Sequence, residues 1–419
     1  MTDVRVTVVG LGYVGLPLAV AAAEKGFAVT GLDTDELRVK RLASGDSYVE
    51  DIPSERLLAA LDSGRLRVTV DPADTDGFDI AVITVPTPLT GGAPDLSCVE
   101  AAARSLAPLL HRGATVILES TSYPGTTEDV LRPLLEQGSG LTAGTGFQLG
   151  YSPERIDPGN ARWRLENTPK IVSGIDDDSL EAVEAFYDRI VDRTVPVSSP
   201  RTAELTKLLE NTFRHVNIAL VNELALCARP LGVDIGEAVE AAATKPFGFM
   251  PFYPGPGVGG HCLPVDPSYL SWQVRRQLHH DVRFVSLANE INEHMPSYVV
   301  QRVATGMGRT LAGARVLLIG LAYKKGTGDV RESPAVEVAR QLHEAGVVVH
   351  AVEPYASAAH LPSYVLCVEL TEQELRASDA VVVLTDHDGL DYDLVERASA
   401  YTYVFDTRSR CRTESVERF

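Results

Sequence analysis

Short apolar runs alternate with helical patterns in the first third of the chain. Four runs rich in Val, Ile and Leu have the character of buried parallel strands, at residues 4–9, 28–32, 80–85 and 115–120. Residues 16–25 have the apolar spacing of a helix, and Gly26 after them is a common helix terminator. Strands that alternate with helices predict a doubly wound parallel sheet.

The middle of the chain follows a different pattern. Between residues 201 and 231, Leu, Phe and Val recur at helical spacing without a strand signal, which predicts one long amphipathic helix. A shorter helix is expected over residues 235–243. The glycines and prolines of residues 245–260 predict a long loop, and long ordered loops are often functional.

The first pattern returns near the C-terminal end. Strands are expected over residues 314–320, 347–352 and 378–385, and a helix over residues 334–344. The fold class is therefore α/β, with two Rossmann-like doubly wound parallel-sheet domains joined by a central helical domain with one long helix. We place the three domains at residues 1–198, 199–298 and 299–419.

Composition narrows the classes of function. The chain has 38 Lys and Arg against 57 Asp and Glu, and the net charge of −19 argues against a nucleic-acid partner. A small polyanion such as a nucleotide stays open. The first residues do not resemble a signal peptide, and apolar stretches fall short of the ~20 residues that span a bilayer. These short stretches predict no membrane partner. The five cysteines are scattered without a C-x-x-C pair, so we expect no metal site and a cytoplasmic location.

A glycine-rich turn after the first strand indicates a dinucleotide site. Gly10, Gly12 and Gly15 form the pattern G-x-G-x-x-G between a strand and a helix, where backbone N–H groups can bind a pyrophosphate. Asp33 ends the second strand, where an acid can accept hydrogen bonds from ribose hydroxyls and repel a 2′-phosphate. This favours NAD over NADP, although a glycine turn in an unrelated α/β protein stays an alternative. The C-terminal counterpart, residues 320–324, lacks the three glycines, and a second dinucleotide is less favoured there.

Two further groups of residues are candidates for chemistry. Cys262 lies in a glycine-rich loop and is a better candidate for a nucleophile than Cys227, which lies within the long helix. Lys207 and Asn211 are four residues apart on one face of that helix, where they could stabilise a developing charge. A small buried cysteine and a solvated polar helix face are the alternatives that these patterns leave open.

Six segments together resemble the UDP-glucose/GDP-mannose dehydrogenase family, in order over nearly the whole chain. They are residues 10–15, 120–121, 152–154, 204–223, 257–266 and 324–334. Members of this family oxidise the C6 hydroxyl of a nucleotide-linked hexose to a carboxylate with two NAD⁺. The resemblance implies that a thiolate holds the aldehyde as a thiohemiacetal and then forms a thioester, which water hydrolyses.

The resemblance also implies roles for individual residues. The catalytic residues would be Cys262, Lys207, Asn211, Asp266, Glu154 and Thr121. NAD would contact Gly10, Gly12, Tyr13, Val14, Gly15, Asp33, Arg38, Pro86, Thr87, Thr121 and Arg331. The UDP-sugar would contact Glu154, Arg155, Lys207, Asn211, Arg214, Tyr253, Gly257, Gly259 and Lys324. A homodimer through the central helix, or a higher oligomer, is expected from its apolar positions.

Positions at which this sequence differs from the UDP-glucose branch of the family indicate which sugar is the substrate. That branch carries a Lys directly before the Asp of the cysteine loop, where Val265 stands here, and a second Glu where Pro158 stands. Its sugar-binding Arg has no clear match, and Lys245 is only a loose candidate. Residues 245–257 look like the branch acting on UDP-N-acetylhexosamines, so UDP-N-acetylglucosamine is the expected substrate. UDP-glucose, another UDP-N-acetylhexosamine epimer, a β-hydroxyacid dehydrogenase and a non-catalytic nucleotide-binding protein stay as alternatives.

Overall fold

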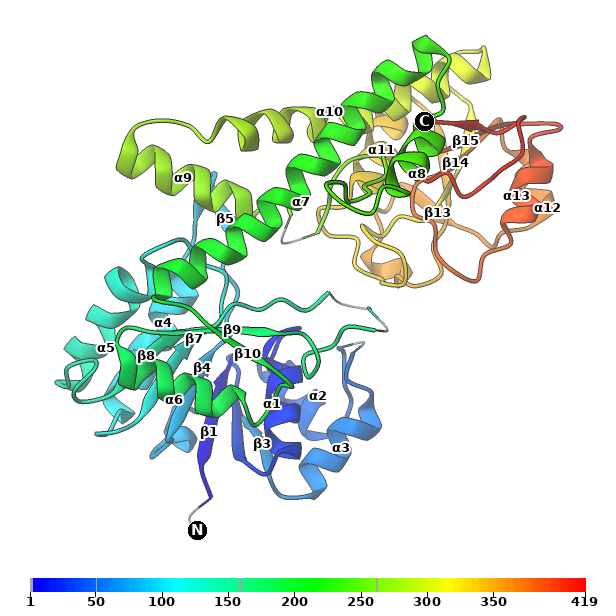
Figure 1. The fold of residues 1–419 in the computed structure, drawn as a ribbon. Coiled ribbons are helices and arrows are strands. Elements are labelled where there is room, and N and C mark those ends of the chain that lie inside the picture. The colour runs from blue at the N-terminus through cyan, green and yellow to red at the C-terminus, as the bar shows by residue number, and fades with distance from the viewer. Residues whose placement is uncertain (1–2, 50, 158–159, 161, 261–262) are drawn as a thin grey trace. The chain divides into compact units, whose positions relative to one another are not determined.

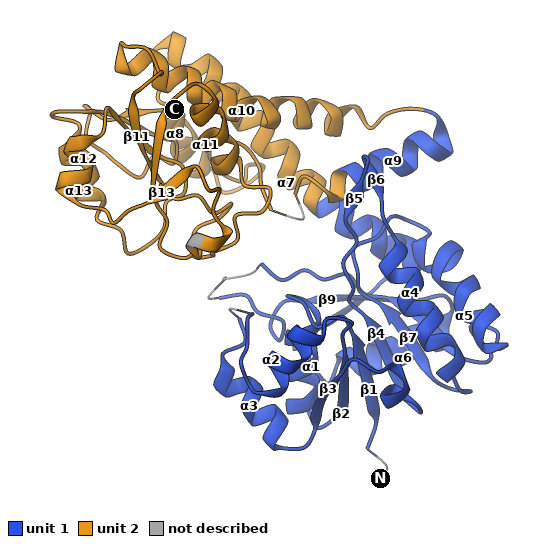
Figure 2. Ribbon diagram, turned by 180° about the vertical axis from the view of Figure 1, so that it is seen from behind, with its two compact units in different colours: residues 1–210, 268–279 blue, residues 211–267, 280–419 orange. Residues whose placement is uncertain are grey.

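The computed structural model describes residues 3–49, 51–157, 160, 162–260 and 263–419. These residues form two compact units, which are coloured separately in Figure 2. The first unit comprises residues 1–210 and 268–279, and the second comprises residues 211–267 and 280–419. Each unit contains its own sheet and core.

The first unit is built on an eight-stranded sheet (Figure 1). Its strands are β1 (Arg5–Val9), β2 (Ala28–Leu32), β3 (Leu66–Thr69), β4 (Ile80–Ile83), β7 (Thr115–Leu118), β8 (Gln148–Tyr151), β9 (Lys170–Gly174) and β10 (Thr194–Pro196). Their order across the sheet is β10-β9-β8-β7-β4-β1-β2-β3. Neighbouring strands are parallel except β8 and β9, where Gly150 lies opposite Gly174 in an antiparallel pair. The sequence did not predict this reversal. The described residues between these two strands form no crossover helix of the kind that joins parallel strands.

Helices cover this sheet and close its core. They are α1 (Gly15–Glu24), α2 (Glu36–Ala43), α3 (Ser54–Asp62), α4 (Ser97–Leu106), α5 (Arg132–Ser139) and α6 (Asp177–Tyr187), with a π-helix at Thr126–Leu131, short 3₁₀ helices at Pro72–Thr75 and Ala107–Leu109, and a two-stranded hairpin of β5 (Leu89–Thr90) and β6 (Ala93–Pro94). All of α1 except Glu24 is buried, because it packs in the core with strands β1 and β2 and helices α3 and α6. This burial explains why α1 consists of small and aliphatic side chains.

The second unit repeats the strand order of the first. Its strands are β11 (Arg315–Ile319), β12 (Val348–Val352), β13 (Val365–Cys367), β14 (Ala380–Val383), β15 (Tyr403–Asp406) and β16 (Glu417–Arg418), in the order β13-β12-β11-β14-β15-β16. All neighbours are parallel. Its helices are α8 (Ile235–Ala243), α10 (Arg283–Met307), α11 (Pro334–Glu344), α12 (Glu372–Ala377) and α13 (Tyr392–Ala398), with a 3₁₀ turn at Ala358–His360.

Two helices belong to both units. Helix α7 (Pro200–Ala228) continues into a 3₁₀ turn at Arg229–Leu231, and the boundary between the units falls after Glu210. Helix α9 (Asp266–Leu278) begins in the second unit and continues in the first. The predicted long helix and both Rossmann-like sheets are thus confirmed. The three domain boundaries stay predictions. In the part of the chain that the structure describes, no helix is both long and apolar enough to cross a bilayer.

Candidate functional site

The turn between β1 and α1 requires its glycines for three different reasons. Gly10 has φ +92°, and a Cβ there would lie 2.9 Å from the carbonyl oxygen of Thr84. A Cβ on Gly15 would lie 1.8 Å from the carbonyl oxygen of Gly10, so the helix can approach the strand only without a side chain. A Cβ on Gly12 would meet nothing within 4 Å, which leaves space for a ligand beside the backbone. This arrangement fits a pyrophosphate on the turn.

The start of α1 offers its N–H groups to an anion. Val14 occupies the N-cap position, where no side-chain hydrogen bond caps the helix, and no acidic residue lies in the first turn. The positive end of the helix therefore faces no negative side chain of its own. Tyr13, just before, is exposed.

Asp33 follows β2 and is held by its neighbours. Its Oδ2 accepts hydrogen bonds from the Leu11 N–H at 2.8 Å and from Arg38 Nη1 at 2.9 Å, and its Oδ1 accepts one from the Asp35 N–H at 3.0 Å. A carboxylate has about four lone-pair sites, so acceptor capacity remains for a ribose hydroxyl. Asp33 and Arg38, both predicted to bind NAD, are thus brought into contact.

Other predicted residues follow parallel strands of the same sheet and so lie at its carboxyl edge. Pro86 and Thr87 follow β4, Thr121 follows β7 and Glu154 follows β8. The Thr87 carbonyl accepts a hydrogen bond from the Tyr269 hydroxyl of α9. The sheet therefore brings the cofactor residues and two of the catalytic candidates to one edge.

Glu154 is fixed through both its backbone and its carboxylate. The amino group of Lys207 donates a hydrogen bond to the Glu154 carbonyl, so the structure brings these two predicted catalytic residues together. Glu154 Oε1 accepts a hydrogen bond from the Ile156 N–H, and Oε2 lies 3.7 Å from Lys170 Nζ. Only 13 % of the Glu154 side chain is exposed.

The sequence analysis missed a buried polar network behind Glu154. Glu119, directly after β7, accepts hydrogen bonds from the Lys170 amino group and, at 2.6 Å, from the Tyr187 hydroxyl. Burial raises the pKa of Glu119 to about 7, against the opposing effect of the Lys170 charge. Burial also raises the pKa of the Tyr187 hydroxyl. An ionisable residue at the end of an otherwise apolar strand was the available signal.

Arg155 is engaged within the first unit. Its guanidinium donates two hydrogen bonds to the Glu210 carboxylate, at 3.2 and 2.6 Å, and one to the Pro169 carbonyl at 2.6 Å. A contact with the sugar would have to use its two remaining N–H groups or replace one of these partners. Its predicted substrate contact therefore stays a prediction.

In the second unit, Asn211 donates a hydrogen bond from Nδ2 to Oδ2 of Asp266, the first residue of α9. Asp266 is buried, which suits a carboxylate that orients an amide. Asn211 lies one helical turn after Lys207 on α7, as predicted, although the boundary between the units falls between them. Arg214 on the same helix is exposed.

The glycine-rich loop lies against a second predicted motif within the second unit. A Cβ on Gly259 would lie 2.6 Å from the carbonyl oxygen of Glu332, and one on Gly260 would lie 2.8 Å from the Tyr323 ring. Gly257 has φ +131°, and a Cβ there would lie 3.0 Å from Pro334. The two ligand-binding segments predicted from sequence are thus in contact. The predicted nucleophile Cys262 lies outside the described residues.

The predicted cations of the second unit follow β11. Arg331 donates from Nε and Nη2 to the Asp329 carboxylate at 2.9 and 2.7 Å, and Lys324 is half-buried. Tyr253, predicted to contact the sugar, is half-exposed. A further cation was missed: Arg408 donates to the Leu384 carbonyl at 2.9 Å, and its guanidinium would lie 2.6 Å from a Cβ on Gly255. Burial lowers the pKa of Arg408, whose side chain is half-buried beside the loop.

Three family models together match most of this chain. They are the NAD binding domain of the UDP-glucose/GDP-mannose dehydrogenase family over residues 4–191, its central domain over residues 201–294 and its UDP binding domain over residues 317–413. The chain belongs to the UDP-glucose/GDP-mannose dehydrogenase family.

Its relatives in this family differ in the sugar they are named for. The UDP-N-acetyl-D-mannosamine dehydrogenase of Pyrococcus horikoshii is 36% identical over 412 residues, covering 97% of this chain and 95% of its own. The UDP-N-acetyl-D-glucosamine 6-dehydrogenase of Pseudomonas aeruginosa is 39% identical over 363 residues, covering 85% of this chain and 84% of its own. The structure of a UDP-glucose dehydrogenase from Pyrobaculum islandicum has a TM-score of 0.87 at 31% identity, covering 99% of this chain and 97% of that chain.

The protein is therefore an NAD-dependent nucleotide-sugar dehydrogenase, as predicted. Within the described residues, no group of His, Cys, Asp and Glu side chains is arranged to hold a metal ion.

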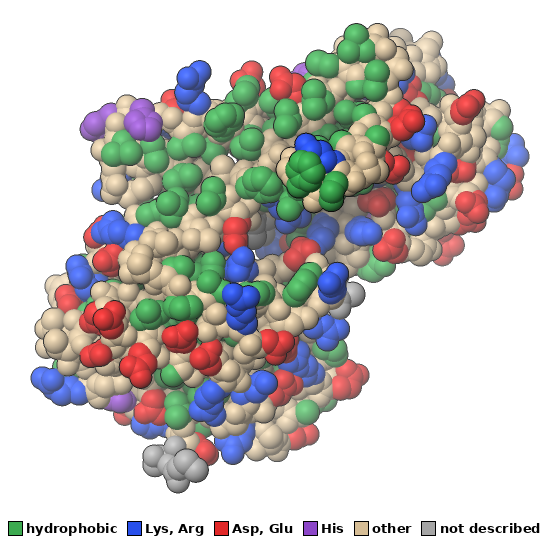
Figure 3. Space-filling view, viewed as in Figure 1, with side chains coloured by type: hydrophobic (Ala, Val, Ile, Leu, Met, Phe, Trp, Pro, Cys, Tyr) green, Lys and Arg blue, Asp and Glu red, His purple; other side chains and the backbone are tan. Residues whose placement is uncertain are grey.

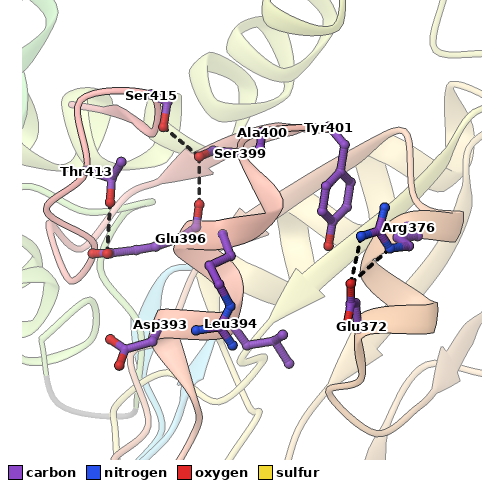
Figure 4. A pocket seen from close by; sticks show the side chains of 11 residues that line it. Glu372, Arg376, Asp393, Leu394, Glu396, Ser399, Ala400, Tyr401, Thr413 and Ser415 are labelled. Carbon is purple, nitrogen blue, oxygen red and sulfur yellow. Dashed lines mark hydrogen bonds and ion pairs between the residues drawn. The ribbon is translucent and has the colours of Figure 1, made fainter.

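A hollow in the second unit is lined by none of the predicted site residues. It has about 680 Å³ and is lined by α12, α13 and residues 413–415 (Figure 4). Its polar side chains bond one another: Arg376 pairs with Glu372, and Thr413 donates to Glu396. The polar groups of this hollow are therefore engaged with one another, whereas the turn at Gly12 leaves space beside its backbone for a ligand.

Proposed function

We propose that the enzyme oxidises the C6 hydroxyl of UDP-N-acetyl-D-glucosamine to the uronic acid, a four-electron reaction that consumes two NAD⁺. The apolar, aromatic loop of residues 245–257 supports an acetamido sugar, since it offers Phe247, Phe249 and Met250 beside few charges. The 39% identity to a UDP-N-acetyl-D-glucosamine 6-dehydrogenase favours the same sugar. The observation that carries the chemistry is the contact between the Lys207 amino group and the Glu154 backbone at the cofactor edge of the sheet.

In the first oxidation, the chain's task is to handle the alcohol proton and the developing negative charge on oxygen. Lys207 supplies a positive charge, and the Asn211 amide, oriented by Asp266, supplies a hydrogen-bond donor. Asp266 would also hold the water that receives the proton. NAD⁺, when bound, accepts the hydride from C6 in each of the two oxidations.

In the second oxidation, Cys262 retains the aldehyde on the enzyme. Its thiolate adds to the aldehyde carbon and forms a thiohemiacetal, and loss of the remaining hydride and the hydroxyl proton gives a thioester. A thiol suits this step because sulfur forms an acyl-enzyme that water can open.

In the hydrolytic step, Glu154 would take a proton from water, which adds to the thioester carbon and releases the Cys262 thiolate. Thr121, at the same sheet edge, would place this water or the nicotinamide. The Gly10–Gly15 turn, Asp33 and Arg38 would hold NAD. Lys324, Arg408 and the loop glycines would hold the UDP-sugar, and Arg331 would hold the cofactor or the substrate.

A substrate panel with product identification tests this proposal. We expect two NADH per sugar consumed, a uronic acid by mass, and the highest kcat/KM with UDP-N-acetyl-D-glucosamine. Cys262→Ala should bind both ligands and form no acid. A tenfold preference for UDP-glucose would overturn the substrate, and unchanged acid production by Cys262→Ala would overturn the covalent route.

UDP-N-acetyl-D-mannosamine is the second candidate substrate. The relative named for it matches 97% of this chain at 36% identity, a longer match than that of the glucosamine enzyme. The two sugars differ only in the configuration at C2, so the same panel separates them.

We also propose a homodimer that uses α7. Exposed apolar side chains recur along this helix at Leu205, Leu209, Phe213, Leu220 and Leu224. Figure 3 shows hydrophobic side chains following the course of α7. Exposed apolar side chains that form a continuous stripe are typical of an interaction surface. Light scattering should give twice the chain mass, and Leu209→Glu with Leu220→Glu should give the monomer mass.

A further inference from the structure

Lys170 occupies an unusual place behind Glu154. It is the first residue of β9 and is 3 % exposed, and its amino group lies between two carboxylates. Glu119 accepts a hydrogen bond from it, and Glu154 Oε2 lies 3.7 Å away. Neither Lys170 nor Glu119 takes part in the proposed oxidation and hydrolysis steps.

The three N–H groups of the ammonium have three partners. Two are hydrogen-bond acceptors, Glu119 Oε1 and the Pro153 carbonyl at 3.1 Å, and the third is the Glu154 carboxylate, an ion-pair partner at 3.7 Å. Lys170 therefore restrains both the backbone just before Glu154 and the Glu154 side chain. On the opposite side, Lys207 donates to the Glu154 carbonyl. Two lysines from different elements thus fix one turn.

Glu119 supplies the charge that keeps this ammonium in the interior. Its side chain is fully buried, and its other oxygen accepts the Tyr187 hydroxyl at 2.6 Å. A buried ion pair contributes little net stability compared with apolar residues of the same size, because desolvation of both charges opposes their attraction. We therefore look for a role of the Lys170–Glu119 pair other than stability. The functional group that Lys170 contacts is the Glu154 carboxylate.

We propose that Lys170, supported by Glu119, is a positioning residue that fixes the Glu154 carboxylate for hydrolysis of the Cys262 thioester. This rests on the proposed function, in which Glu154 takes a proton from water. The oxygen of that water bonds to the acyl carbon, the C–S bond breaks, and its electron pair stays on the Cys262 sulfur. The acid product then ionises to solvent. Lys170 gains and loses no proton in this step.

A variant in which both Lys170 and Glu119 are neutral distinguishes two roles of Lys170: positioning Glu154, or only pairing with the charge of Glu119. In the double variant Lys170→Met/Glu119→Gln, both charges are removed at similar volume, so no buried charge is left unpaired. If Lys170 served only as a partner for Glu119, this variant would turn over normally. If Lys170 positions Glu154, hydrolysis stays impaired although the fold is intact.

Rapid mixing with NAD⁺ and the UDP-sugar separates oxidation from hydrolysis. We expect the double variant to release two NADH per active site at the wild-type rate and then to turn over roughly 100-fold more slowly, as a misplaced catalytic group does. Acid quenching and mass measurement should find the acyl group on Cys262. Wild-type steady-state turnover, or a first burst slowed as much as the steady state, would overturn the proposal.

Two further variants distinguish the possible failures. Glu154→Gln is the benchmark and should show the same burst and the same trapped acyl group. If Glu154→Gln shows neither, the proposed role of Glu154 is wrong and this inference fails with it. If Glu154→Gln traps the acyl group and the double variant does not, only the role of Lys170 is wrong. The control is Arg302→Met/Glu417→Gln, which removes an ion pair at 2.5 Å in the second unit. Glu417 also pairs with Arg229 at 2.9 Å, and this variant should leave turnover unchanged.

Discussion

In both sheets of this enzyme, the strand at the centre is followed by a glycine in a position where a side chain would clash. Gly10 directly follows β1 and has φ +92°, and Gly320 directly follows β11 and has φ +80°. A Cβ on Gly10 would lie 2.9 Å from the Thr84 carbonyl, and one on Gly320 would lie 2.3 Å from that of Thr385. In each sheet the glycine lies against the backbone of a threonine that follows the neighbouring strand, β4 or β14. A side chain at the glycine position would clash with this backbone.

The acids that follow β2 and β12 differ in what they bind. Asp33 accepts three hydrogen bonds from the protein and keeps acceptor capacity. Glu353 accepts hydrogen bonds from the backbone N–H groups of Leu321, Ala322, Tyr355 and Ala356, and it pairs with His387 Nε2 at 3.1 Å. Glu353 is therefore saturated by its own unit and serves the turn rather than a ribose.

The helices that follow the glycines differ as well. α1 begins at Gly15, so its N-terminus lies at the turn, whereas α11 begins only at Pro334. The intervening residues 321–333 carry Lys324 and Arg331. The first sheet thus offers N–H groups to a phosphate and the second offers side-chain cations. Equivalent positions in a repeated topology therefore need not bind equivalent groups.

Replacing Gly15 by Ala should have the largest effect. A Cβ there would lie 1.8 Å from a backbone oxygen, so the strand and α1 must separate. We expect the free energy of unfolding to fall by roughly 4 kcal/mol or more, in the exceptional range for one substitution. Urea unfolding measures this loss.

Gly12→Ala is the matched control within the same turn. Its Cβ would meet nothing within 4 Å, so stability should change by less than about 0.5 kcal/mol while the KM for NAD rises. Equal destabilisation by the two substitutions would show that the glycines do not have separate roles.

Glu353→Gln should have the next largest effect, on stability alone. Hydrogen bonds and His387 outweigh burial and lower the pKa of Glu353 to about 2. A lowered carboxyl pKa stabilises the fold above the unfolded value of about 4.5, and this contribution disappears as the pH falls from about 4.5 to about 2. The loss at pH 7 should be about 3 kcal/mol.

Urea unfolding of Glu353→Gln and wild type at several pH values measures this difference. The two curves should converge toward pH 2. Glu344→Gln is the control, since Glu344 pairs with Arg340 at an exposed site and should contribute less than about 1 kcal/mol. A pH-independent loss in Glu353→Gln would contradict the ionic origin.

The sequence predicted the central strands of both sheets, because these strands are apolar and their turns need glycine. It did not predict the outer strands β3, β8, β9, β10, β13, β15 and β16. The apolar spacing of residues 201–231 likewise predicted α7, and it placed Lys207 and Asn211 on one face of that helix. Local patterns could not predict that β9 runs antiparallel to β8, since a reversal depends on the path of an irregular loop. They also could not distinguish Asp33 from Glu353, because saturation by backbone N–H groups exists only after folding.

The polar network behind Glu154 shows the same limit. Glu119 and Lys170 are far apart in sequence, and each taken alone resembles an ordinary charged residue at a strand end. Only the pairing of β7 with β8 and of β8 with β9 brings them together. Arg408 was missed for the same reason, since its place beside Gly255 depends on a distant loop.

Lys324→Met tests whether the second sheet relies on cations. Loss of one charge-assisted contact with a phosphate should raise the KM for the UDP-sugar about 20-fold and leave the KM for NAD unchanged. Initial rates with each substrate varied in turn measure both constants. Lys325→Met is the control, because Lys325 is exposed and lies 3.6 Å from Asp388. A rise in the KM for NAD alone would place Lys324 at the other ligand.

Asp33→Asn should have the smallest effect and would sharpen the contrast with Glu353. The amide oxygen can still accept the Leu11 N–H, so the turn should keep its shape and most of its stability. Loss of the charge weakens the bond to a ribose hydroxyl and removes the repulsion of a 2′-phosphate. We expect the KM for NAD to rise about fivefold and the preference for NAD over NADP to fall by a similar factor. Steady-state kinetics with both cofactors measure this change, and a stability loss as large as that of Glu353→Gln would mean that both acids serve their turns in the same way.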